Sequence, residues 1–367
     1  MRKIFLSLAL ATVFASCNSK NNLTVKLSDV GNDSIVVNVL TPDLNDLEKK
    51  ETIGLKNGEG VFNFEGEKAR MAIIHVNTPE GRKGLEAWLI PGMDCLLTGK
   101  TTDYKVSGCV FHTDYEAFKN TISEQEKKQK ALFEEFKTKV EAGENRDSLV
   151  KIIGPAFNTL EEEIENKKIE YIKANPTNNV SAALLVQVNN AEELITLLST
   201  DVKNGAFSDF VVAVQKRIDT EKARKEAQKD IADGMMAPDF TLKDLDGNDL
   251  ALSSLRGKYV VLDFWGSWCG WCIKGIPEMK KYYEKYSGKL EILGIDCNDT
   301  EKAWRDAIAK HQIPWKHVYN PRSSNLTTTY AIEGFPTKII VDPQGKIVKT
   351  VVGEDPAFYT FLDELLK

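Results

Sequence analysis

The feature that most constrains this chain is a pair of cysteines separated by two residues, within the segment Trp-Cys-Gly-Trp-Cys at 268–272. An apolar stretch at 259–265 predicts a buried strand before the pair, and a helical pattern runs from about 269 to 286. Cysteines at a helix start can close a small disulfide ring, and the helix dipole favours a thiolate at Cys269. The spacing predicts that Cys269 attacks, while the deeper and less exposed Cys272 resolves the mixed disulfide.

A zinc site is the alternative interpretation of this spacing, but zinc needs two further ligands. None of the four histidines follows the pair at ligand spacing, and the other cysteines are isolated in the sequence. The sequence also lacks a glycine-rich phosphate loop and the Cys-x-x-Cys-His motif of covalent haem attachment. We therefore expect no metal and no cofactor.

Charge and length narrow the class of protein further. The 48 basic and 54 acidic residues give a formal charge of −6, which disfavours nucleic acid as a partner. A chain of 367 residues with 42% hydrophobic residues is expected to form two or three globular domains. The only membrane-like apolar run is the one at the extreme N-terminus.

The N-terminus has the pattern of a secretory signal at 1–16, with Arg2 and Lys3 before a short apolar run. The segment Phe-Ala-Ser-Cys at 14–17 resembles a bacterial lipobox, although its first residue departs from the usual Leu. That resemblance implies an acylated Cys17, a lipid-bearing tether at 17–22 and a membrane lipoprotein in the periplasm-facing cell envelope. The alternative is ordinary cleavage after Ala15 into a soluble exported protein. Either route places the mature chain where disulfides persist.

Three patterns follow one another along the mature chain. Short alternating segments separated by turn residues predict an antiparallel β-sandwich at 23–110. Helical periodicity at 111–232 predicts two long helices that meet near 142–145, followed by shorter ones. Strands and helices then alternate at 237–367, which predicts an α/β domain with an antiparallel hairpin at one edge. The fold class is therefore multidomain, with separate β, helical and α/β parts.

Residues 237–367 resemble the thioredoxin domain of extracytoplasmic thiol-disulfide oxidoreductases of the TlpA and ResA type. The stretch 261–272 matches the active-site strand and loop of that family nearly position for position, and Pro277 matches the proline inside its active-site helix. The segment 23–110 resembles a β domain of unassigned function that precedes thioredoxin domains in other lipoproteins. The resemblance implies an enzyme that exchanges disulfides with cysteine-containing exported proteins and draws electrons from a membrane thiol donor.

A second motif of the same family, Gly-Phe-Pro-Thr at 334–337, resembles its cis-proline loop. A cis bond costs little before proline, so the Phe335–Pro336 bond can adopt it, although an ordinary trans turn is the alternative. The resemblance implies that Phe335 and Pro336 form a platform for an extended substrate.

Residues around and between the cysteines are further candidates for substrate contact, namely Trp268, Gly270 and Trp271. Trp271 replaces the proline of cytoplasmic thioredoxins, and residues at this place tune the reduction potential.

Asp263 is a lone carboxyl within an apolar strand, six residues before Cys269. Burial should raise its pKa, and a carboxyl beneath the pair could take the proton of Cys272. The position matches the buried Asp of thioredoxins, whereas many membrane-anchored relatives place a Glu at the position of Gly275. We therefore expect Asp263 to be the proton acceptor, with a purely structural carboxyl as the alternative.

The remaining cysteines suggest no chemistry of their own. Cys95 and Cys109 could pair, although two free thiols are favoured, and Cys297 is expected to be buried.

The main functional hypothesis is a membrane-anchored reductase, with cytochrome c maturation as one setting and an oxidase or isomerase of the same fold as the alternative. A thiol peroxidase is disfavoured because its Pro-x-x-x-Thr-x-x-Cys motif would have Leu262 at the proline position and Gly266 at the threonine position, so the threonine that binds peroxide is absent. A non-enzymatic lipoprotein scaffold is the remaining alternative.

Overall fold

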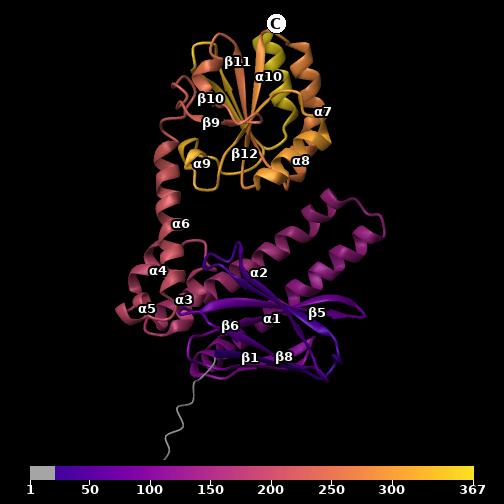
Figure 1. Ribbon diagram of the computed structural model, residues 1–367, viewed down its shortest axis with the longest axis vertical. Helices are drawn as coiled ribbons and strands as arrows, with labels where there is room; N and C mark the ends of the chain where they lie inside the picture. Colours follow the sequence, from indigo (N-terminus) through magenta and orange to yellow (C-terminus); the bar gives the residue numbers. More distant parts are fainter. Residues whose placement is uncertain (1–20) are drawn as a thin grey trace, which may run out of the picture. The chain divides into compact units, whose positions relative to one another are not determined.

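The computed structural model describes residues 21–367, so the signal peptide expected at 1–16 and the lipidation site Cys17 lie outside the described residues. The chain divides into two compact units, which end and begin at Arg217 and Ile218. Within the described part, no helix combines the length and apolar character that a membrane span requires. Figure 1 shows the elements of each unit.

The first half of the N-terminal unit is a sandwich of two four-stranded sheets, with the strand orders β4-β1-β7-β8 and β3-β2-β5-β6. The strands are β1 (Asn21–Leu27), β2 (Ser34–Leu40), β3 (Leu47–Gly54), β4 (Glu59–Phe64), β5 (Arg70–Thr78), β6 (Gly81–Leu89), β7 (Cys95–Lys100) and β8 (Asp103–Ser107). Alternate residues of both sheets form one apolar core, as the period-two pattern predicts. The expected antiparallel sandwich is present.

Two details of the sandwich differ from the sequence expectation. β1 pairs with β7 in parallel, with Val25 opposite Leu97, whereas short turns between strands favour antiparallel neighbours. β1 also begins at Asn21, inside the tether expected at 17–22, because the backbone of Asn21 and Asn22 pairs with β4. Backbone pairing does not require apolar side chains, so composition alone missed these two residues.

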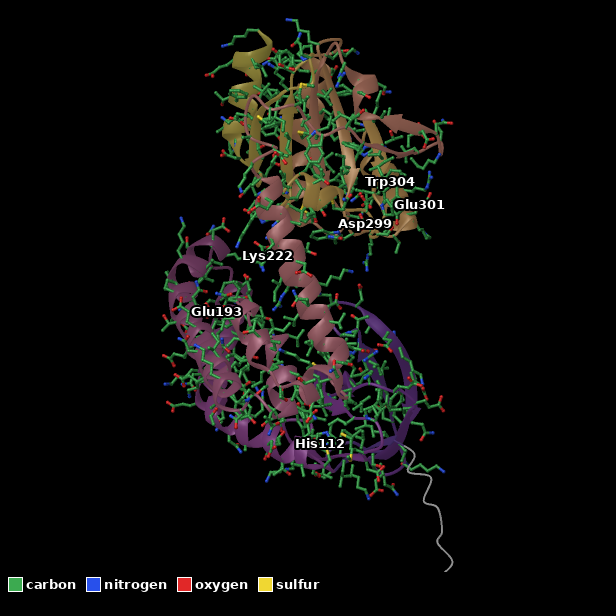
Figure 2. The ribbon with its side chains drawn as sticks, turned by 90° about the vertical axis from the view of Figure 1, so that its left-hand side faces the viewer. His112, Glu193, Lys222, Asp299, Glu301 and Trp304 are labelled. Atoms are coloured by element: carbon green, nitrogen blue, oxygen red, sulfur yellow. A yellow bond between two sulfur atoms is a disulfide. The ribbon has the colours of Figure 1, made fainter. Side chains whose placement is uncertain are left out.

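The second half of the N-terminal unit is helical. The helices are α1 (Val110–Glu141), α2 (Arg146–Ala174), α3 (Asn179–Leu185), α4 (Glu192–Leu197), α5 (Thr200–Asn204) and the first half of α6 (Ser208–Ala227), whose second half belongs to the C-terminal unit. α1 and α2 form the expected long hairpin, and Asn145 caps α2 by accepting a hydrogen bond from the Ser148 amide at 2.9 Å. Near the start of α1 the ring of His112 is buried, with Nε2 2.8 Å from the Trp88 carbonyl oxygen (Figure 2).

The C-terminal unit is a seven-stranded mixed sheet with the order β10-β9-β13-β12-β11-β14-β15. Its strands are β9 (Thr241–Asp244), β10 (Asp249–Ala251), β11 (Tyr259–Trp265), β12 (Leu290–Asp296), β13 (Lys316–Tyr319), β14 (Thr337–Val341) and β15 (Ile347–Val352). Its helices are η1 (Leu252–Leu255, a 3₁₀ helix), α7 (Gly270–Lys285), α8 (Glu301–His311), α9 (Leu326–Thr329) and α10 (Pro356–Leu366). The edge hairpin β14–β15 is present, and the short hairpin β9–β10 is an addition that the sequence pattern did not predict.

Alternation along β11 distributes its side chains between two apolar cores. Val261 and Trp265 point to the face that packs under α7, α8 and α10, whereas Leu262 and Phe264 point to the opposite face with α9 (Figure 1). Asp263 has the parity of Val261 and Trp265, so it lies on the α7 face.

The C-terminal unit also includes residues that precede position 237. Ile231 joins the core on the α9 face, and the Gly234 amide donates to the Ile347 carbonyl oxygen at 2.7 Å. Arg224, in the last turn of α6, donates to the Ile332 carbonyl oxygen at 3.5 Å. These contacts join distant parts of the chain, so the local pattern could not reveal them.

Candidate active site

Cys269 and Cys272 form a disulfide at the start of α7, with their Cα atoms 5.2 Å apart. Cys269 is the N-cap residue of this helix, and its sulfur accepts a hydrogen bond from the Cys272 amide at 3.1 Å. A helix N-terminus and a donated amide hydrogen both stabilise negative charge on the Cys269 sulfur when the disulfide opens. The expectation that Cys272 is less exposed than Cys269 is wrong, because each cysteine is 6% exposed in the disulfide form.

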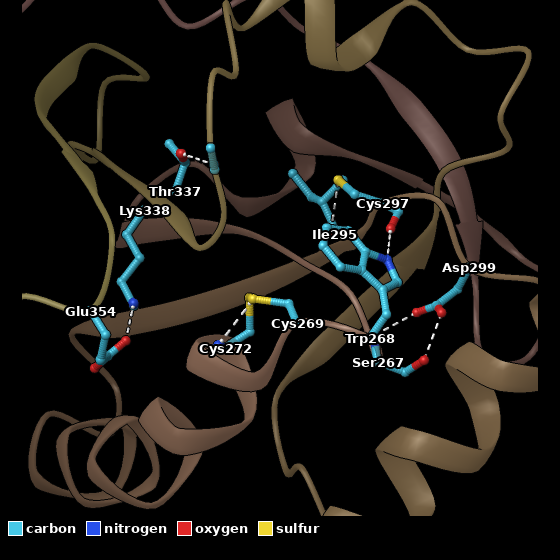
Figure 3. The surroundings of a disulfide bond; sticks show 11 residues. Ser267, Trp268, Cys269, Cys272, Ile295, Cys297, Asp299, Thr337, Lys338 and Glu354 are labelled. Carbon is cyan, nitrogen blue, oxygen red and sulfur yellow. Dashed lines mark hydrogen bonds and ion pairs between the residues drawn. A yellow bond between two sulfur atoms is a disulfide. The ribbon is translucent and has the colours of Figure 1, made fainter. Parts of the chain in front are cut away.

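The loop between β11 and the disulfide is hydrogen-bonded to the segment after β12 (Figure 3). The Ser267 amide and hydroxyl donate to the two carboxylate oxygens of Asp299, at 2.7 and 2.6 Å. The Trp268 indole nitrogen donates to the Cys297 carbonyl oxygen at 2.8 Å. A Cβ atom at Gly266 would lie 2.4 Å from that indole nitrogen, so only glycine at this position leaves room for the bond. The loop is therefore held by tertiary hydrogen bonds as well as by the strand and helix at its ends.

Exposed aromatic side chains flank the disulfide. Trp268 is 53% and Trp271 56% exposed, although large apolar side chains are usually covered. The Phe335 ring meets the Trp268 ring edge to face, with centroids 5.3 Å apart, and the Phe335–Pro336 bond is cis. The structure thus brings Trp268 and Phe335 together, while Gly270 has open space where a Cβ would point. An apolar surface of this kind beside a redox pair suits contact with another polypeptide.

Asp263 lies on the face of the sheet that carries the disulfide, and it is 9% exposed. The pKa of this carboxyl is raised to about 6, chiefly because it is buried; the charge of Lys338 opposes the rise and that of Glu354 adds to it. Directly opposite Asp263 in the antiparallel ladder is Lys338 of β14. The raised pKa fits a group that can exchange a proton near neutral pH.

Three site residues were missed by the sequence reasoning. The Lys338 side chain is only 3% exposed, and its ammonium lies 2.6 Å from the carboxylate of Glu354 (Figure 3). The Tyr359 hydroxyl donates to the other oxygen of Glu354 at 2.6 Å. Lys338 interrupts an apolar strand just as Asp263 does, so the same signal could have found it. Glu354 and Tyr359 carry no such signal, because they lie in a polar loop and on an amphipathic helix.

Two further carboxyls, those of Asp296 and Asp299, lie near the loop between β11 and the disulfide, and Asp299 accepts its hydrogen bonds. Asp296, at the end of β12, is fully buried, and the pKa of its carboxyl is raised to about 8. Burial is the main cause, and the neighbouring carboxyl of Asp299 adds to it. A carboxyl with this pKa is mostly protonated at neutral pH, while the neighbouring Asp299 accepts both hydrogen bonds of Ser267.

Three further cysteines in the part of the chain that the structure describes carry free thiols. Cys95 and Cys297 are buried and Cys109 is partly exposed, with its sulfur 3.4 Å from His112 Nδ1. Burial raises the pKa of Cys95 to about 12 and that of Cys297 further still, so both thiols stay protonated.

A disulfide at the start of a helix, after a buried central strand and beside a cis-proline loop, defines the C-terminal unit as a thioredoxin-like redox domain. Residues 234–350 match the sequence model of the AhpC/TSA family. Thiol-disulfide oxidoreductase ResA of Bacillus cereus is 35% identical over 122 residues, which are 33% of this chain and 70% of the relative. The protein of the same name from Bacillus subtilis is 31% identical over 127 residues, 34% of this chain and 70% of the relative.

Two solved structures resemble part of the chain. The thioredoxin domain of a thiol-disulfide oxidoreductase from Bacteroides vulgatus is 34% identical, with 37% of this chain and 99% of that chain covered and a TM-score of 0.35. A thiol:disulfide interchange protein from Bacteroides sp. is 33% identical, with 37% and 91% covered and a TM-score of 0.35. By its relatives, the chain belongs to the thioredoxin-like family of thiol-disulfide oxidoreductases, and it is an enzyme of that type.

Proposed function

We propose that Cys269 and Cys272 reduce disulfides in cysteine-containing exported proteins, while an acylated Cys17 anchors the chain at the membrane. The observation that carries the proposal is the disulfide at the N-terminus of α7, beside the exposed rings of Trp268 and Trp271. The name of the ResA relatives, thiol-disulfide oxidoreductase, supports the reaction type. The signal-like N-terminus supports export.

The reaction proceeds in two exchanges. The Cys269 thiolate attacks one sulfur of the substrate disulfide, and the other substrate sulfur leaves as a thiolate that takes up a proton. Cys272 then gives its proton to the carboxylate of Asp263 and attacks the Cys269 sulfur. The Cys269–Cys272 bond forms, the mixed disulfide breaks, and the second substrate sulfur leaves with the electron pair. A membrane thiol donor must return two electrons before the next cycle.

Trapping of the mixed disulfide tests this sequence of steps. In cells, Cys272→Ser should accumulate disulfide-linked complexes between Cys269 and exported partner proteins. Dithiothreitol should reduce these complexes and release the partners. Cys269→Ser is the matched control and should trap nothing. Absence of complexes with Cys272→Ser would contradict the proposal.

The reduction potential of the pair decides the direction of transfer. A value near or below about −250 mV would support a reductase, with cytochrome c maturation as one setting, whereas about −120 to −180 mV would indicate an oxidase or isomerase. The assay is titration of the chain from residue 18 onward with glutathione or dithiothreitol, followed by alkylation and mass measurement.

The anchor requires its own experiment. Cells grown with a labelled fatty acid should incorporate the label into the wild-type chain, which should fractionate with membranes. Cys17→Ala should lose the label and leave the membrane fraction. Unlabelled wild-type protein would indicate a soluble exported enzyme instead.

A further inference from the structure

A carboxylate from a distant part of the chain fills the space beside the active-site helix. Gly275 lies three residues after Cys272 in α7, so both positions are on one face of the helix. A Cβ atom at Gly275 would lie 2.3 Å from Oε2 of Glu354 and 2.5 Å from its carboxyl carbon. The carboxylate of Glu354 therefore sits against α7 where the side chain of residue 275 would otherwise be, one turn beyond Cys272.

This carboxylate is part of a buried charge cluster that also contains Asp263. Lys338 is opposite Asp263 in the β11–β14 ladder, and side chains directly opposite share a face of the sheet. The Lys338 ammonium is bound to Glu354 at 2.6 Å, and both of these charges act on Asp263. The Glu354 side chain is 14% exposed and also accepts the Tyr359 hydroxyl, so it is fixed in place.

One buried ammonium thus pairs with the carboxylate of Glu354, and its charge also acts on Asp263. If both carboxyls were ionised, the cluster would carry one uncompensated negative charge, which burial makes costly. Protonation of one carboxyl removes this negative charge. The proton binds to the carboxyl that interacts less strongly with Lys338. The titratable groups whose charges interact with Asp263 are Lys338, Glu354, Tyr359 and Cys297, and Cys272 belongs to the apolar core on the same face of the sheet.

We propose that Glu354 is a positioning residue for proton transfer at the redox pair: it keeps the Lys338 ammonium from neutralising Asp263 and thereby sets the pH at which Asp263 accepts the Cys272 proton. The proposal deepens the proposed function and rests on the role given there to Asp263. It assigns the residue to the control of a proton, and not to contact with the substrate.

The resolution step can be followed by itself in the reduced chain from residue 18 onward. One equivalent of 5,5′-dithiobis(2-nitrobenzoate) forms a mixed disulfide at Cys269 and releases one coloured thiolate. Attack by Cys272 then releases a second one. The rate of the second release, measured from pH 4 to pH 9, reports the proton acceptor.

Two substitutions should move this pH profile in opposite directions. Glu354→Gln removes a negative charge and frees Lys338 for Asp263, so the midpoint assigned to Asp263 should fall by about one pH unit. Lys338→Met should raise the midpoint by a similar amount. Glutamine keeps an oxygen that can accept the Tyr359 hydroxyl hydrogen, which favours a folded variant. A purely structural disturbance would move both profiles in the same direction.

Matched variants make the test decisive. Glu364→Gln changes the net charge equally at an exposed position of α10 and should leave the profile unchanged. Asp263→Asn should abolish the midpoint, and adding Glu354→Gln to it should then have no further effect on the profile.

Each way of failing has its own meaning. An unshifted midpoint in Glu354→Gln, or shifts of the same sign in Glu354→Gln and Lys338→Met, would overturn the inference. An unchanged profile in Asp263→Asn would instead overturn the role of Asp263 within the proposed function. If Lys338→Met does not fold, the comparison of Glu354→Gln with Glu364→Gln decides the question.

Discussion

Replacement of Asp263 by asparagine should change how the stability of the C-terminal unit depends on pH. In the folded protein the pKa of this carboxyl is raised from 3.8 to about 6, mainly because burial disfavours its charged form. Between these two values the folded chain holds a proton that the unfolded chain has released. The free energy of unfolding must therefore fall as the pH rises through this range, and the Asp263 contribution is fully present only below about pH 4.

The size of the effect follows from the shift. A rise of about two pH units, at about 1.4 kcal/mol for each unit, makes wild type lose about 3 kcal/mol between pH 4 and pH 7 through this group alone. The asparagine side chain cannot ionise, so the variant should lack this loss. The stability difference between variant and wild type should thus shift by about 3 kcal/mol in favour of Asp263→Asn as the pH rises.

Denaturant unfolding of the oxidised full chain, followed by tryptophan fluorescence at several pH values, measures this difference. Five of the six tryptophans, all except Trp88, lie in the C-terminal unit, so the signal reports chiefly on that unit. Any constant effect of losing the carboxylate cancels, because only the change with pH is compared. A difference that stays within about 0.5 kcal/mol from pH 4 to pH 8 would refute the reasoning that burial controls Asp263.

Three further outcomes are expected. Gly275→Ala should destabilise the C-terminal unit because its Cβ would lie 2.3 Å from Glu354, although alanine favours helices by about 1 kcal/mol over glycine. Gly270→Ala, which has open space at its Cβ, is the control, and equal melting temperatures for the two variants would contradict the predicted clash. Wild type should lose stability as the pH rises toward about 8, because Asp296 releases its proton on unfolding, and Asp296→Asn should lack this loss. The same dependence of melting temperature on pH in both proteins would argue against it. Phe335→Ala should slow reduction of a protein disulfide about tenfold but leave a small disulfide unaffected, and equal slowing of both would argue against a polypeptide platform.

The local chemistry of the active site was readable from the sequence. The cysteine pair, the strand before it and the helix after it are contiguous, so their mutual geometry follows from short-range rules for helix starts and buried strands. Asp263 was visible for the same reason, since a carboxyl in an apolar strand is conspicuous. The Phe335–Pro336 bond was expected to be cis from its motif, and the structure confirms it.

Only the tertiary structure decided which distant groups meet beneath the disulfide. Sheet register places Lys338 opposite Asp263, and the connection after β15 delivers Glu354 into the space left by Gly275. The Asp299 carboxylate likewise reaches Ser267 from the segment after β12. Such contacts depend on the pairing of strands far apart in the chain, where a shift by one residue turns every side chain to the other face. The sequence therefore determined the reacting sulfurs, and the fold determined the charges that surround their proton.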